Sequence, residues 1–141
     1  MTMLRAILAI LILGALAGNA GAEVVVVVNA DNPAGPLSRR EVVDLFMGRT
    51  QYFADGSLVL RLDQAPESPE RAEFYRGLVN KSVAEVNAYW AKLLFTGRAS
   101  PPQVVGSSRA VLDAVRDNKS AIGYVDSADV DDSVKVVARV D

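Results

Sequence analysis

Apolar residues along this chain fall into blocks whose spacing changes between strand-like and helix-like. Five consecutive valines, 24–28, show no alternation with polar residues, which predicts a strand buried on both faces. Two more strands are predicted at 58–62 and 121–125. The last block, 134–140, alternates apolar residues with Lys135, Val137 and Arg139, which predicts a strand at a sheet edge with one wetter face.

Helix starts are marked by serines placed before apolar residues at helical spacing. Two of these serines are followed three residues later by a glutamate, the capping box, and a third precedes a proline, which suits the first helical position. The predicted starts are Ser38, Ser68, Ser82 and Ser107 or Ser108. Strands alternating with helices predict an α/β fold, a three-layer single domain with a mostly parallel sheet.

The first 22 residues have a different pattern. They carry one charge, Arg5, then an apolar stretch from Ala6 to Ala17, then small residues up to Ala22. This is the layout of a cleaved secretory signal peptide. A permanent anchor is the alternative, but it needs about 20 apolar residues, and the run 6–22 has 17 and ends in small ones. We therefore predict a signal peptide at 1–22, a single domain at 23–141, and a soluble product in the periplasm.

Composition narrows the chemistry of that domain. The chain has no Cys and no His, which excludes disulfides, thiol nucleophiles, histidine bases and Cys or His metal sites. Without Arg5, 14 basic and 17 acidic residues remain, a formal charge of −3, and the basic ones are scattered rather than gathered into a nucleic-acid-binding face. Known nucleophile motifs and Gly-rich phosphate loops are missing. The composition therefore favours a binding protein that needs no cofactor over an enzyme.

The most informative segment for function is the turn from the second strand into the next helix, residues 61–71. Ligands of open α/β sheets bind beyond the carboxyl ends of strands, and helix N-termini attract anions. The Ser68 hydroxyl, the backbone N–H groups of Glu70 and Arg71, and the Arg71 guanidinium could together bind an anion. Two further side chains could close this site, those of Arg61 and Gln64.

A structural explanation of the same turn also stands. Ser68 would then only cap the helix, and Arg71 would be a surface charge one turn further on. Glu67 and Glu70 already complement the helix dipole and would repel a phosphate.

Other segments carry weaker signals. Arg49-Thr50 and Thr96-Gly97-Arg98 each put a hydroxyl and a guanidinium after a helix, where they would either meet an oxyanion or complement the helix C-terminus. The acidic loop 126–132 lacks calcium-loop spacing and is interpreted as a solvated turn. Tyr89-Trp90 is interpreted as core packing, although a Trp can also stack on a ligand.

Several short motifs follow one another in a particular order. They are Val24–Val28 with Asn29 and Asn32-Pro33, Leu37-Ser38, Val43-x-x-Phe46-x-Gly48-Arg49, Asp55-Gly56, Ser68-x-x-Arg71-x-x-Phe74, and Ala121-Ile122-Gly123-Tyr124-Val125. This order resembles the phosphate-binding proteins of ABC transporters, over about Val24 to Val140. The resemblance implies one lobe of their two-lobed, type II periplasmic-binding fold.

The resemblance also implies a function: non-catalytic binding of phosphate or a similar small oxyanion at the Ser68 helix start, with an ABC permease or another periplasmic protein as partner. Asn29 is a further candidate ligand. The chain departs from the family at Ser68-Pro69-Glu70, where the family has Ser-Gly-Thr, and at Phe53, where it commonly has Trp. The family's arginine before this turn has no aligned partner unless Arg61 or Arg71 substitutes.

The resemblance covers one lobe only, whereas in that family the ligand is enclosed between two. A second hypothesis is therefore a lobe that kept the fold, lost its ligand, and serves as a structural or protein-interaction module of a periplasmic assembly.

Overall fold

A computed structural model describes residues 23–140, so the signal peptide expected at 1–22 lies outside the described residues. The elements, in chain order, are β1 (Val24–Asn29), α1 (Arg39–Phe46), β2 (Leu60–Gln64), α2 (Pro69–Val79), α3 (Val83–Phe95), β3 (Gln103–Gly106), α4 (Ser108–Asp117), β4 (Ala121–Asp126), a 3-10 turn (Ser127–Asp129) and β5 (Val134–Val140). Within residues 23–140, no helix is both long and apolar enough to cross a bilayer.

The five strands form one mixed sheet in the order β3-β2-β4-β1-β5. β2 is parallel to β3 and to β4, whereas β1 is antiparallel to β4 and to β5. The prediction of a mostly parallel sheet holds for strand direction, because only β1 is reversed, whereas parallel pairs occur only in the β3-β2-β4 half. A run of valines indicates burial on both faces but carries no information on strand direction, so the sequence pattern missed the reversal of β1.

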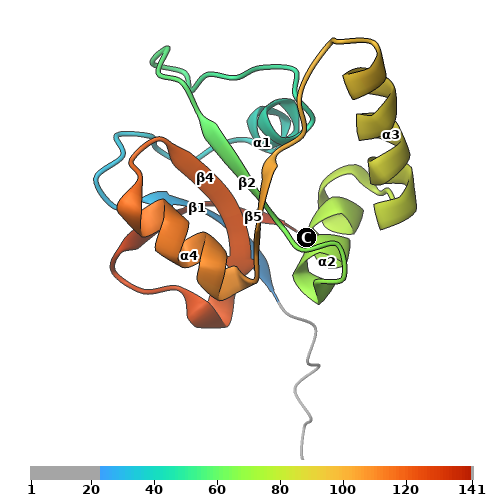
Figure 1. The fold of residues 1–141 in the computed structure, drawn as a ribbon. Helices are drawn as coiled ribbons and strands as arrows, with labels where there is room; N and C mark the ends of the chain where they lie inside the picture. Colours follow the sequence, from blue (N-terminus) through green and yellow to red (C-terminus); the bar gives the residue numbers. More distant parts are fainter. Residues whose placement is uncertain (1–22, 141) are drawn as a thin grey trace, which may run out of the picture.

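Helices cover both faces of this sheet, which confirms the three-layer prediction (Figure 1). Val24, Val26 and Val28 pack with α1, α2 and α3, while Val25 and Val27 pack with α4. All five valines are at most 2% exposed. The unbroken valine run is explained by these two cores, because successive side chains of a strand point to opposite faces.

The capping serines lie where the sequence predicted them. Ser38 and Ser82 both form complete capping boxes, Ser68 caps α2 ahead of Pro69, and Ser107 caps α4. The sequence pattern did not predict β3, because this strand has only four residues and its first two are exposed.

Helix α4 packs closely against β4 at Gly123. A Cβ atom built on Gly123 would lie 2.4 Å from Cγ1 of Val111, closer than carbon atoms pack. A residue without a side chain is therefore required where α4 crosses β4.

Candidate functional site

A hollow of about 550 Å³ lies between the N-termini of α2 and α4. β2, β3 and β4 run in the same direction and end beside one another at Gln64, Gly106 and Asp126. The first N–H groups of a helix have no partner within the helix and carry partial positive charge. Two helix N-termini at the carboxyl ends of three strands form a place where a small anion can be held.

Ser68 lines this hollow and also caps α2. Its Oγ accepts a hydrogen bond from the Arg71 backbone N–H at 3.4 Å. The same Oγ lies 2.6 Å from Oε1 of Gln64 and 2.9 Å from Oε2 of Glu70. A hydroxyl has one proton, so it can donate to only one of these oxygens.

The orientation of the Gln64 amide follows from its other two partners. Gln64 is fully buried, and its Nε2 donates to the Tyr124 carbonyl at 2.8 Å and to Ser108 Oγ at 3.1 Å. A carbonyl only accepts, so the amide nitrogen faces Tyr124 and Oε1 faces Ser68. The Ser68 proton is therefore bonded within the protein, to Gln64 Oε1 or to the Glu70 carboxylate, and Ser68 has no proton left for a ligand.

The Ser108 hydroxyl differs from that of Ser68 in its hydrogen bonds. Its Oγ accepts from Gln64 Nε2 and from the Asp126 backbone N–H at 3.0 Å. Two accepted bonds occupy both lone pairs, which leaves the hydroxyl proton as a donor toward the hollow that Ser108 lines. Gln64 thus links the N-termini of α2 and α4. The sequence had suggested instead that its amide faces a ligand.

Arg71 is turned into the core. Its side chain is 7% exposed, its Nε lies 3.4 Å from Oδ1 of Asp63, and its Nη2 donates to Oδ1 of Asn87 at 3.0 Å. The guanidinium also stacks over the Tyr75 ring, 5.4 Å from its centroid. The sequence predicted a surface or ligand-binding charge, but the guanidinium is the partner of a buried carboxylate.

Two tyrosine hydroxyls complete the surroundings of Asp63. Tyr75 donates to Asp63 Oδ2 at 2.8 Å, and Tyr124 donates to Oδ1. Burial is the main cause that raises the pKa of both tyrosines, and the Asp63 charge adds to it. Both hydroxyls stay protonated and act as donors. This buried network joins β2 to α2 and β4 beneath the hollow.

Two predicted ligand residues lie away from the hollow. Arg61 donates to the carbonyls of Ser100 and Leu45, at 2.8 and 3.4 Å, and burial lowers its pKa. Asn29 donates to the carbonyls of Val115 and Arg116 at the C-terminus of α4. Because β1 is antiparallel to β4, Asn29 lies at the opposite end of the strands from Ser68.

The rest of the hollow combines three carboxylates with one guanidinium. Glu67, Glu70 and Asp129 line it together with Arg109. Arg109, Ser107 and Ser108 were not predicted as site residues. A signal for them exists: Gly106-Ser107-Ser108 places two hydroxyls at a strand-to-helix junction, as the Ser68 turn does with one.

The weaker candidates have local roles. Arg49 pairs with Asp44 at 3.5 Å and is largely exposed, while the Thr96 hydroxyl donates to carbonyls of its own helix. Trp90 is buried in the core, as predicted. Across residues 23–140, no three or more His, Cys, Asp or Glu side chains gather where they could hold a metal ion.

Solved structures share this fold. An ABC-type phosphate transport receptor from Vibrio cholerae matches with a TM-score of 0.65 and 20% identity over 82% of this chain and 45% of its own. A putative phosphate ABC transporter substrate-binding protein with bound phosphate from Clostridium perfringens matches with 0.65 and 19% over 82% and 44%. PstS from Borrelia burgdorferi matches with 0.62 and 11% over 82% and 46%.

The chain thus spans less than half the length of each of these structures. It has the fold of one lobe of a phosphate ABC transporter substrate-binding protein, which confirms at the level of fold the resemblance found in the motifs. No protein-family model and no curated protein matches the sequence.

Proposed function

We propose that the hollow between α2 and α4 binds a small oxyanion, phosphate first among them, and that the protein is a non-catalytic binding protein. The observation that supports this most is the meeting of two helix N-termini at one hollow. The similar structures include one with bound phosphate.

The donors in this proposal come mostly from α4. The Ser108 hydroxyl proton and the N-terminus of α4 are available as donors beside the hollow, and Arg109, which lines it, adds a full positive charge. Ser68 contributes no hydroxyl donor to a ligand, because its proton is bonded to Gln64 or Glu70.

Weak, salt-sensitive binding follows from the surroundings. Glu67, Glu70 and Asp129 oppose a negative ligand, and the rim is exposed to solvent and mobile ions. We propose that the protein works in the periplasm, in contact with a permease or another envelope protein that would cover the ligand.

Titration calorimetry with phosphate, repeated at low and high salt, tests the proposal. Arg109→Gln is expected to weaken binding about three- to tenfold, whereas the matched control Arg40→Gln, at an exposed arginine of α1, leaves it unchanged. Ser68→Asp keeps a capping oxygen but adds a charge, so it is expected to abolish binding while α2 stays folded. If millimolar phosphate releases no heat and shifts no amide signal of α2 or α4, the proposal is wrong.

A second candidate function is a protein-interaction module without a ligand. The end of α3 favours it, because Leu94 and Phe95 are 60% and 93% exposed. Large apolar side chains left in water side by side are typical of contact surfaces. Sedimentation of the wild type against Leu94→Ser/Phe95→Ser would reveal whether this end mediates self-association, and a monomer in both cases would remove its support.

A further inference from the structure

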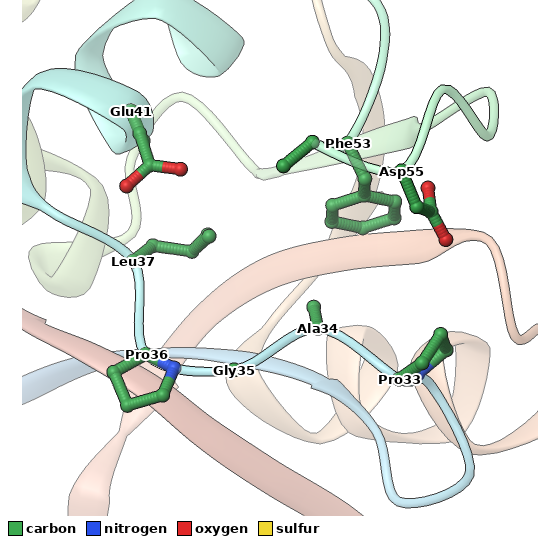
Figure 2. A pocket seen from close by; sticks show the side chains of 9 residues that line it. Pro33, Ala34, Gly35, Pro36, Leu37, Glu41, Phe53 and Asp55 are labelled. Carbon is green, nitrogen blue, oxygen red and sulfur yellow. The ribbon is translucent and has the colours of Figure 1, made fainter.

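A second depression lies toward the other end of the strands, where β1 ends and β2 begins (Figure 2). It consists of two neighbouring hollows of about 200 and 130 Å³ that share Leu37, Glu41, Phe53 and Ala54 as lining residues. We call it the Phe53 groove. Its walls are the loop 33–37 on one side, and α1 and the segment 50–55 on the other.

The walls of the Phe53 groove are mostly apolar and are held in place. In Figure 2, the side chains of Ala34, Leu37 and Phe53 point toward one another across it. The Leu37 N–H donates to the Val137 carbonyl at 2.8 Å, and the Phe53 N–H donates to the Ser57 carbonyl at 2.9 Å. Backbone bonds to β5 and within the turn therefore fix both walls before anything binds.

Apolar surface continues outside the groove. Tyr52, which lines its smaller hollow, is 55% exposed. Leu58, its partner in an isolated antiparallel bridge, is 58% exposed. Such a patch beside a preformed groove extends the surface that a longer occupant would cover.

Negative charges line the groove. Glu41, shared by both hollows, and Asp55 lie on opposite sides of the larger hollow in Figure 2, and Asp44 lines the smaller one. Hydrogen bonds from the Ser57 hydroxyl and N–H lower the pKa of Asp55. Arg39, in the first turn of α1, donates to the Leu78 carbonyl at the end of α2 and not to these carboxylates. Arg49 offsets only the Asp44 charge.

We propose that the Phe53 groove docks an extended segment of a partner protein in which apolar side chains are flanked by lysine or arginine. The apolar side chains enter between Leu37 and Phe53, and the flanking cations reach Glu41 and Asp55. Charge complementarity selects this occupant, because the carboxylates of Glu41, Asp44 and Asp55 around the groove repel acidic segments, nucleic acids and anionic lipid surfaces. The groove is separate from the oxyanion hollow, so the proposal does not depend on it.

Amide NMR titrations of residues 23–141 with three short peptides test this proposal. The probes are acetyl-Lys-Phe-Leu-Lys-amide, its Glu-flanked counterpart, and acetyl-Lys-Ser-Ser-Lys-amide. We expect the first alone to shift the amide signals of Ala34, Gly35 and Ala54. Equal binding of the Glu-flanked or Ser-Ser peptide, shifts confined to other regions, or no shifts at millimolar concentration would each overturn the proposal. Phenethylammonium binding as tightly as the first peptide would assign the groove to small amines instead and also overturn it.

The chain offers charge changes that spare the fold. Glu41→Gln keeps the capping box with Ser38, and Asp55→Asn keeps an acceptor for the Ser57 N–H. Each is expected to weaken the first peptide about two- to fivefold. Ala54→Lys, at an exposed wall position, is expected to abolish binding, while the control Ala88→Lys on the exposed face of α3 leaves it unchanged. Unaltered affinity in Ala54→Lys contradicts the location.

Discussion

Replacing Arg71 by methionine tests whether its guanidinium serves the core or a ligand. The change removes the 3.4 Å contact with Asp63 and the 3.0 Å bond to Asn87. Asp63 would remain in the core, 2% exposed, with the hydroxyls of Tyr75 and Tyr124 as donors. We expect a stable fold with a clearly lower free energy of unfolding.

The magnitude follows from the burial of both partners. Removing one member of a buried ion pair costs about 3–5 kcal/mol. The methionine stem refills part of the space and two hydroxyls still hold the carboxylate, so we expect the lower end, about 3 kcal/mol. With an m value of about 2 kcal/mol/M, the urea midpoint falls by about 1.5 M.

Urea unfolding followed by Trp90 fluorescence measures this change, since Trp90 is the single tryptophan and is buried. The control Arg76→Met, at an exposed arginine of α2, is expected to shift stability by less than about 0.5 kcal/mol. The double variant Asp63→Asn/Arg71→Met is expected to lose less than the sum of its single changes, by about 1 kcal/mol or more. A loss below about 1 kcal/mol for Arg71→Met, together with weaker phosphate binding, would refute the structural role.

Two further predictions concern the same core. Above about pH 10 the tyrosines of the unfolded chain ionise, whereas Tyr75 and Tyr124 keep their protons in the folded state. The contribution of these two tyrosines to the free energy of unfolding is therefore fully present below that pH. It is lost as the pH rises, by about 2.7 kcal/mol per pH unit for the two together. Alkaline urea titrations should show that slope, reduced by about half in Tyr75→Phe; an unchanged slope would contradict it. Gly123→Ala is expected to lower the free energy of unfolding by about 1–3 kcal/mol, because the new methyl group clashes with Val111. Adding Val111→Ala should restore part of this loss in thermal melts, and no restoration would contradict the clash.

The sequence predicted most secondary structure because the relevant signals are local. Ser38 with Glu41, and Ser82 with Glu85, identify helix starts within four residues, and both capping boxes form. The strand predicted at 58–62 lies at 60–64, a shift of two residues. β3 was missed because its exposed residues follow no alternation, and only pairing with β2 makes it a strand.

Of the residues predicted for the site, the structure brings only some to one hollow. Ser68 and Glu70 line the hollow, whereas Arg61 and Asn29 bond to carbonyls elsewhere. A guanidinium or amide that lies near a turn in sequence can point to either side of the sheet, and sequence spacing does not say which. Arg71 is the clearest case, since its direction depends on Asp63 and on Asn87 of another helix.

The sequence alone determined the lack of thiol and imidazole chemistry, the serine-capped helices and the double burial of residues 24–28. These properties depend on residue type and on spacings within a few positions. The tertiary structure decided the reversed direction of β1, and it placed Ser108 against Gln64, 44 residues away. The donor of Ser108 depends on that long-range bond, because the Gln64 amide and the Asp126 N–H occupy both lone pairs of Ser108 and leave its proton to donate.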